Sequence, residues 1–108
     1  MRVLLTGAAG FCGQAAVQVL GREHWLRCTT HTTTMEPPAN GEVVNIDLAN
    51  YADTEAIVQG IDAIVHNASV ALHMGDYTNP EGPMKAPGVG TANLLEAARR
   101  AGSQRFVL

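Results

Sequence analysis

A glycine-rich segment near the start of the chain reads Thr6-Gly7-Ala8-Ala9-Gly10-Phe11-Cys12-Gly13. Before it stands the mostly apolar run Arg2 to Thr6, which is typical of a strand buried on both faces of a parallel sheet. After the glycines, apolar residues recur at helical spacing and predict one broad apolar stripe on a helix that ends at Gly21. The residues of that stripe are Phe11, Cys12, Ala15, Ala16, Val19 and Leu20.

Each glycine of this segment has a physical use between a strand and a helix. Gly7 permits a sharp exit from the strand, Gly10 lets the backbone approach a pyrophosphate, and Gly13 lets helix and strand pack closely. The helix that follows offers free N–H groups and a positive partial charge to phosphates. Glycines also serve ordinary turns, but the strand before and the helix after favour a dinucleotide-binding loop.

The rest of the chain alternates between strand-like and helix-like patterns. A short helix is indicated after Asn50 and Asp53, and a second one between Leu94 and Gly102. Residues 31–41 and 75–90 are rich in turn-forming residues, and we interpret both as loops. Further strands are predicted at Trp25 to Thr30, Val43 to Ile46, Ala63 to Val65 and Arg105 to Leu108. This alternation predicts an α/β fold with a Rossmann-type, doubly wound parallel sheet of about five strands, in the order 3-2-1-4-5.

The bulk composition narrows the possible function classes. The 108 residues suit one domain spanning 1–108, with 46% hydrophobic residues and a net charge of -3. This charge gives no reason to expect nucleic-acid binding, and no apolar run reaches the ~20 residues that a membrane span needs. Cys12 and Cys28 fit neither metal nor disulfide spacing, so we interpret both as small core residues of a cytoplasmic protein without a metal site.

The sequence resembles the short-chain dehydrogenase/reductase superfamily, above all the extended branch of nucleotide-sugar epimerases, dehydratases and uronate dehydrogenases. The matching stretches cover nearly the whole chain in the expected order, although none of them identifies a substrate. They are residues 6–13, Asp47-Leu48, His66-Asn67-Ala68-Ser69, and residues 90–98 running on to Arg105-Phe106-Val107-Leu108.

The resemblance implies a set of residues around a dinucleotide. Those at the pyrophosphate would be Gly7, Gly10 and Gly13, with backbone contacts from Phe11 and Cys12. Asp47 and Leu48 would flank the adenine, although Asp47 also fits a turn or helix cap. The residues that would close over the cofactor after the fourth strand are Asn67, Ala68 and Ser69. His66 is either part of this site or a packing residue at the strand end.

The choice between NAD and NADP depends on the end of the second strand. An acidic residue about 20 positions beyond the glycines would bind a ribose 2′-hydroxyl, as in NAD-binding domains. Here the strand ends in Thr30 and His31, with no carboxylate, and these two residues could accommodate a 2′-phosphate. The pattern therefore leans slightly toward NADP, although His31 also fits an exposed loop.

The resemblance also implies a catalytic tyrosine and lysine in a Tyr-x-x-x-Lys arrangement, which this chain does not contain. Its only tyrosines are Tyr51 and Tyr77, and its sole lysine, Lys85, follows neither at that spacing. A further departure is Pro87, where the family often has an asparagine. We therefore assign no catalytic residue in this chain.

Two functions follow from these observations. The first is the truncated NAD(P)-binding part of an oxidoreductase or epimerase that acts on a sugar-like or small carbonyl substrate, inactive by itself. The second is a non-catalytic dinucleotide-binding or sensor module that acts through a protein partner. Because the last predicted strand leaves a sheet edge, self-association through that edge is a further expectation.

Overall fold

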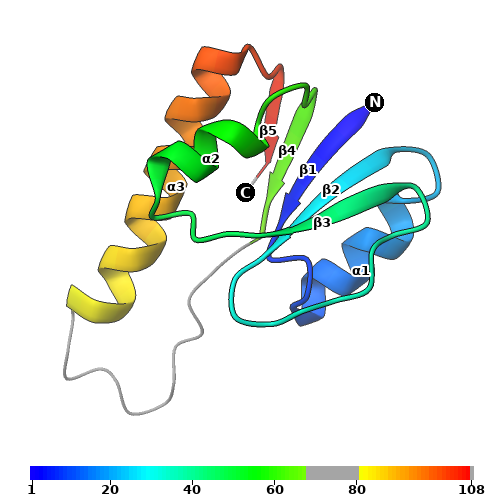
Figure 1. The fold of residues 1–108 in the computed structure, drawn as a ribbon, viewed down its shortest axis with the longest axis horizontal. Helices are drawn as coiled ribbons and strands as arrows, with labels where there is room; N and C mark the ends of the chain where they lie inside the picture. Colours follow the sequence, from blue (N-terminus) through cyan, green and yellow to red (C-terminus); the bar gives the residue numbers. More distant parts are fainter. Residues whose placement is uncertain (68–80, 108) are drawn as a thin grey trace.

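The computed structural model describes residues 1–67 and 81–107, with only the backbone for 81–88. The described strands form a five-stranded parallel sheet in the order β3-β2-β1-β4-β5 (Figure 1). In chain order the elements are β1 (Arg2–Thr6), α1 (Phe11–Leu20), β2 (Trp25–Thr30), β3 (Gly41–Asn45), α2 (Tyr51–Ile57), β4 (Ala63–His66), α3 (Glu81–Ala101) and β5 (Arg105–Val107). Both the predicted Rossmann-type architecture and the predicted strand order are confirmed.

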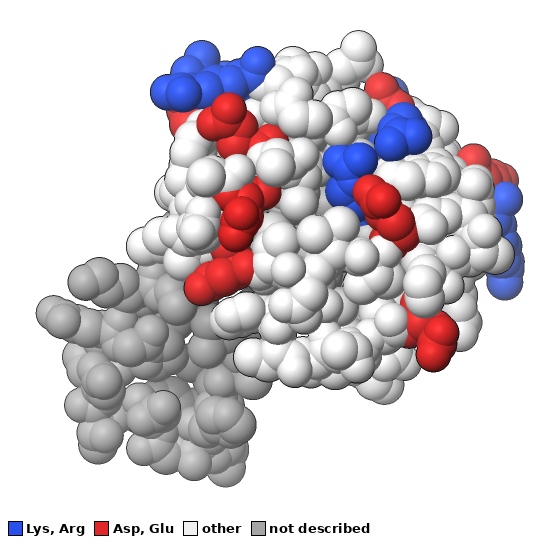
Figure 2. Space-filling view, viewed as in Figure 1, with Lys and Arg blue, Asp and Glu red and all other residues white. Residues whose placement is uncertain are grey.

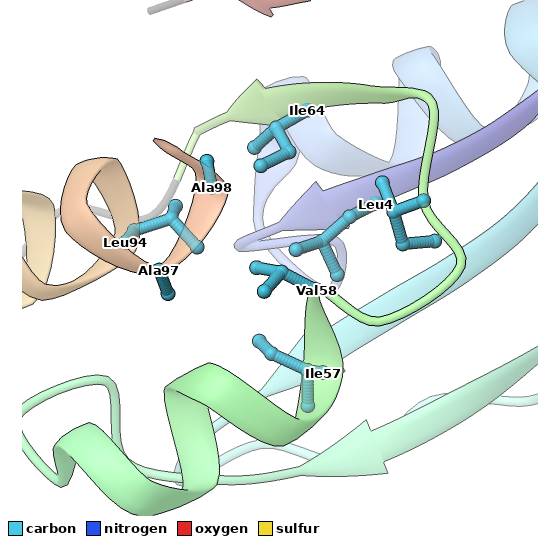
Figure 3. Close-up of a cluster of buried hydrophobic side chains, with 8 residues drawn as sticks. Leu4, Ile57, Val58, Ile64, Leu94, Ala97 and Ala98 are labelled. Atoms are coloured by element: carbon cyan, nitrogen blue, oxygen red, sulfur yellow. The ribbon is translucent and has the colours of Figure 1, made fainter. Parts of the chain in front are cut away.

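Helices cover both faces of the sheet, with α1 on one face and α2 and α3 on the other (Figure 1). Side chains alternate across a strand, so neighbouring residues of β1 enter different cores. Val3 and Leu5 join the cluster beneath α1, while Leu4 joins the cluster beneath α2 and α3. The second cluster, shown in Figure 3, consists of Leu4, Ile57, Val58, Ile61, Ile64, Leu94, Ala97 and Ala98.

The apolar stripe predicted for α1 is correct for Ala16 and Leu20, which pack on the sheet, and wrong for its other members, which are exposed. Phe11 is 95% exposed and Val19 is 64% exposed, and Cys12 is exposed rather than a core residue. The face that packs on the sheet consists of Gly13, Ala16, Val17 and Leu20. A Cβ at position 13 would overlap the Gly7 carbonyl oxygen, so α1 must turn its glycine inward, and this rotation carries Phe11 outward. Cys28, by contrast, is buried as predicted.

The loop predicted for residues 75–90 is wrong from residue 81 onward, because α3 begins at Glu81. Pro83 lies in the first turn, where a backbone N–H has no helical partner to lose. Pro87 removes one helical hydrogen bond, and the helix continues through it to Ala101. The remainder of that predicted loop lies outside the described residues.

On the face shown in Figure 2, Arg side chains lie in separate groups, each with Asp or Glu side chains close by. Several Asp and Glu side chains also form a column that runs downward from the basic group at the upper left. Among the described helices, none combines the length and the apolar character that crossing a bilayer requires.

Candidate cofactor-binding site

The glycine loop between β1 and α1 is built from three glycines with three different functions. Gly7 adopts a φ of 66°, a left-handed conformation that favours glycine, and its carbonyl accepts from the Gly10 N–H at 3.1 Å. Gly13 lies against that same carbonyl with no room for a side chain. A Cβ at Gly10 would meet only the Gly7 oxygen, at 3.4 Å, so the space beside Gly10 is otherwise open. The loop therefore has no room for a side chain at Gly13 and open space for a ligand beside Gly10.

The N-terminus of α1 has no side chain of its own to satisfy it. Gly10 is the N-cap residue, in an extended conformation, and the first turn contains no acidic residue. The first backbone N–H groups of a helix have no helical partner, and together they carry a partial positive charge. With the open space beside Gly10, this end of α1 fits the pyrophosphate of a dinucleotide.

The ends of β2 and β3 bring two of the predicted residues together. His31 and Asp47 have side chains that are 65% and 57% exposed, and His31 Nε2 lies 3.9 Å from Asp47 Oδ2. The other carboxylate oxygen of Asp47 accepts from the Ala49 N–H at 2.9 Å, as in a turn. Thr30 is buried, and its hydroxyl accepts from Asn45 Nδ2 at 3.1 Å. Of the two residues predicted at the ribose, only His31 is therefore accessible.

Leu48 is held between the sheet and α3. Its side chain packs on the cluster of Figure 3, and Gly90 approaches so closely that a Cβ there would meet Leu48 Cβ at 3.1 Å. Asn93 Nδ2 donates to the carbonyl of Leu48 at 2.9 Å and to that of Ala49 at 3.1 Å. Gly90 and Asn93 were not predicted as individual site residues. The sequence signal that could have indicated them is their spacing of three residues, which places a glycine and a polar side chain on one face of the helix.

The end of β4 carries a buried hydrogen-bonded histidine. His66 is 8% exposed, its Nδ1 lies 2.7 Å from Thr6 Oγ1, and its Nε2 lies 2.9 Å from Thr91 Oγ1. Burial lowers the pKa of His66 below its ordinary value of 6.5, so the ring is neutral near pH 7. The backbone N–H of Asn67 donates to the same Thr6 hydroxyl at 3.0 Å. The remaining predicted residues, Ala68 and Ser69, lie outside the described part of the chain.

The match to known proteins covers almost the whole chain. Residues 3–108 match the model of the NAD dependent epimerase/dehydratase family. The chain belongs to this family. The predicted resemblance to the epimerase and dehydratase branch is thereby confirmed.

Curated relatives of this family member include two dehydrogenases. It is 39% identical to the 3 beta-hydroxysteroid dehydrogenase/Delta 5-->4-isomerase of Mycobacterium tuberculosis, over 98% of this chain and 30% of that protein. It is 35% identical to the uronate dehydrogenase of Pseudomonas putida, over 98% of this chain and 39% of that protein. The chain thus spans well under half of the length of either relative.

Solved structures agree with this placement. The uronate dehydrogenase of Agrobacterium tumefaciens is 33% identical and superposes with a TM-score of 0.82, over 97% of this chain and 38% of that one. A variant of that enzyme was solved in complex with NAD and matches with the same TM-score of 0.82. The relatives named here are therefore dehydrogenases, and a variant of one of them was solved with bound NAD.

Proposed function

We propose that this chain binds NAD and is the cofactor-binding part of an oxidoreductase or epimerase. The observation that carries the proposal is the N-terminus of α1, which has no capping side chain and no acidic residue in its first turn. The pyrophosphate would accept hydrogen bonds from the N–H groups of Phe11, Cys12 and Gly13, beside the open space at Gly10. A variant of the related uronate dehydrogenase was solved in complex with NAD, which supports NAD as the ligand.

Two relatives bear on the substrate class. One is a uronate dehydrogenase and the other is a 3 beta-hydroxysteroid dehydrogenase/Delta 5-->4-isomerase. We infer that the whole enzyme acts on a sugar-like or small carbonyl compound. Bound NAD would supply the hydride acceptor or donor, and the residues of this chain would hold and orient it. Its sequence contains no Tyr-x-x-x-Lys pair, and we assign no proton-transfer group to this chain.

The environment of His31 supports NAD over NADP as the cofactor. Asp47 lies within 3.9 Å of His31, and both side chains are exposed, so a 2′-phosphate here would approach a carboxylate. Thr30, the other residue that could receive the phosphate, is buried and already bonded to Asn45. The sequence pattern leaned slightly toward NADP because the end of β2 contains no acid. The carboxylate that Asp47 brings from the end of β3 supports the opposite preference.

Calorimetric titration of NAD and NADP into the 108-residue chain tests the proposal. NAD should bind more tightly than NADP, and Gly10→Val should weaken both by filling the space beside α1. Ala52→Val adds similar bulk at an exposed position in the first turn of α2 and serves as the matched control. Equal binding by the unaltered chain and Gly10→Val would exclude the glycine loop as the site.

A second substitution tests the cofactor preference alone. Asp47→Asn removes the negative charge that we propose disfavours NADP, so the difference in affinity between NAD and NADP should become smaller. Gly10→Val should leave the ratio of the two affinities unchanged. An unaltered ratio in Asp47→Asn would contradict the role of the carboxylate. A preference for NADP in the unaltered chain would contradict the choice of cofactor but leave dinucleotide binding intact.

The action of this chain through a protein partner, its cytoplasmic location and its self-association through the sheet edge remain predictions. For self-association, the relevant edge is β5 (Arg105–Val107), in which Val107 is 54% exposed. Light scattering after size exclusion tests it, since a monomeric mass at high micromolar concentration would contradict association. Turnover without any added protein would contradict the non-catalytic alternative.

A further inference from the structure

His66 connects three elements that meet at the cofactor-binding end of the sheet. Its ring nitrogens contact Thr6 at the end of β1 and Thr91 in α3, at 2.7 and 2.9 Å. The Thr6 hydroxyl also accepts from the N–H of Asn67, directly after β4, at 3.0 Å. Gly7, the first residue of the glycine loop, follows Thr6 in the chain. A single buried ring therefore joins the loop, the end of β4 and the helix that packs against Leu48.

The two distances are consistent with one placement of the ring proton, on Nε2. In proteins an O–H···O bond is typically 2.7–2.8 Å long and an N–H···O bond 2.9–3.0 Å. The 2.7 Å contact fits donation by the Thr6 hydroxyl to an unprotonated Nδ1, and the 2.9 Å contact fits donation by Nε2–H to Thr91. A helical threonine commonly donates its own proton to a carbonyl one turn earlier, which leaves its oxygen free to accept.

We propose that His66 is a positioning residue of the cofactor site, which as a neutral ring with its proton on Nε2 holds the glycine loop and the end of β4 against α3. The proposal rests on the proposed function in one respect, namely that the loop after Thr6 receives the pyrophosphate. A second proton on Nδ1 would oppose donation by the Thr6 hydroxyl, which already accepts from Asn67. The hydrogen bonds would then have to rearrange, and the loop would loosen.

The described groups that face the ring carry no charge that would compensate for its protonation. These groups are the hydroxyls of Thr6 on β1 and Thr91 on α3, together with the Phe106 ring on β5, whose centroid lies 6.0 Å away. None of them is charged, and a buried imidazolium without a carboxylate is costly. Cofactor affinity should therefore fall at acidic pH, when His66 is forced to accept a second proton.

The tautomer can be measured without any cofactor. Two-bond 1H–15N spectra of the histidine-labelled 108-residue chain distinguish Nε2–H, Nδ1–H and doubly protonated rings. The His66 signal should show the Nε2–H form at pH 7.5 and still be neutral at pH 6, where an ordinary histidine is largely protonated. His24, at the other end of the sheet, provides a comparison ring in the same sample. An Nδ1–H ring, or a charged ring at pH 6, would overturn the proposal.

Substitutions then separate positioning from plain packing. His66→Asn keeps an oxygen near the Nδ1 position, so at pH 8 its NAD affinity should stay within about twofold of the unaltered chain. His66→Leu keeps the bulk without either hydrogen bond and should bind NAD about fivefold to tenfold more weakly. Thr91→Val leaves the buried Nε2–H without an acceptor, a cost that His66→Asn avoids because it has no Nε2–H, and should fall between them. Equal affinities in all three variants at pH 8 would overturn the role in positioning.

The dependence on pH gives the remaining readout. Between pH 8 and 5, NAD affinity should fall in the unaltered chain and in His31→Gln, but much less in His66→Asn, which has no ring to protonate. A decline of the same size in His66→Asn would overturn the proposal, even if His66→Leu fails to fold. An unaltered chain that binds no NAD at pH 8 would instead contradict the proposed function, while the tautomer spectrum still decides the state of His66.

Discussion

The helices α1 and α2 both begin where a parallel strand has ended, yet their N-termini differ. α2 begins after Asn50, whose side-chain oxygen accepts from the Asp53 N–H at 3.1 Å, and Asp53 adds a negative charge to the first turn. α1 begins after Gly10, which has no side chain, and its first turn contains no acid. One helix satisfies its own N-terminus, while the other leaves its donors for a ligand.

This difference shows that a helix N-terminus can serve as a binding site because it lacks a capping side chain. A capping side chain stabilises a helix by about 1 kcal/mol relative to alanine but by only a few tenths relative to glycine, so Gly10 sacrifices little stability at the start of α1. Its position is fixed instead by packing, since Gly13 lies against the Gly7 carbonyl and Val17 and Leu20 pack on the sheet. An anion at the N-terminus of α1 would supply the missing partner. Four predictions test this contrast.

The largest effect is expected from Gly13→Ala. The added Cβ would overlap the Gly7 carbonyl oxygen and approach the Ala8 backbone, neither of which can move without displacing the loop. We expect a loss of about 2–3 kcal/mol in the free energy of unfolding, seen as a fall of roughly 10–20 °C in Tm by circular dichroism. Gln18→Ala, at an exposed position of α1, should change Tm little. An unchanged Tm in Gly13→Ala would contradict the tight packing of the loop.

Gly10→Asp should convert the start of α1 into one that resembles α2. Gly10 already has the extended conformation of an N-cap residue, so the fold should persist, with a stability gain of only a few tenths of a kcal/mol. The new carboxylate would occupy the N–H groups and repel a pyrophosphate, so NAD affinity should fall about tenfold or more. Calorimetry measures the affinity of Gly10→Asp for NAD and for NADP. An affinity equal to that of the unaltered chain would mean that the phosphates do not bind at the N-terminus of α1.

The two cysteines should differ in reactivity, because Cys12 is exposed in the first turn of α1 and Cys28 is buried in β2. Burial raises the pKa of the Cys28 thiol to about 11, so at pH 8 it carries almost no reactive thiolate. Mass spectrometry after iodoacetamide should find Cys12 modified and Cys28 intact until denaturant is added. Saturating NAD should slow the modification of Cys12 several-fold. No slowing would argue against a cofactor at α1.

Asn50→Ala should have the smallest effect and should be confined to stability. Removal of the cap of α2 leaves the Asp53 N–H without its partner and should cost about 1 kcal/mol in the free energy of unfolding, measured by urea denaturation. NAD affinity should not change, because α2 satisfies its own N-terminus. A clear loss of NAD affinity would show that the two helix ends are not independent.

Acid should also destabilise the fold through His66, and the direction follows from its lowered pKa. Below the ordinary pKa of 6.5, the unfolded chain takes up a proton that the folded chain resists. The contribution of His66 is therefore constant above about pH 7.5 and is lost as the pH falls through 6.5 toward the lower folded-state pKa. Denaturation at several pH values should show this decline, and His66→Asn should reduce it.

Local patterns in the sequence were sufficient for the architecture and for the loop. The run from Arg2 to Thr6, the glycines at three-residue spacing and the Asn50 cap each obey short-range rules, and the structure confirms these elements at nearly the predicted bounds. Alternating strands and helices with crossover lengths then leave few topologies, which is why the strand order could be predicted. The family match places the chain where these motifs indicated.

Contacts between residues far apart in the sequence could not be predicted from such local patterns. The inward face of α1 depends on Gly13 meeting Gly7, so part of the predicted apolar stripe, including Phe11 and Val19, is exposed. His66 reaches Thr6, 60 positions away, only because β4 pairs with β1, and it reaches Thr91 only because α3 crosses the same end of the sheet. The sequence by itself thus determined which elements form and where the glycine loop lies. Only the tertiary structure decided which side chains share the site, because strand pairing and helix rotation join residues that no local rule connects.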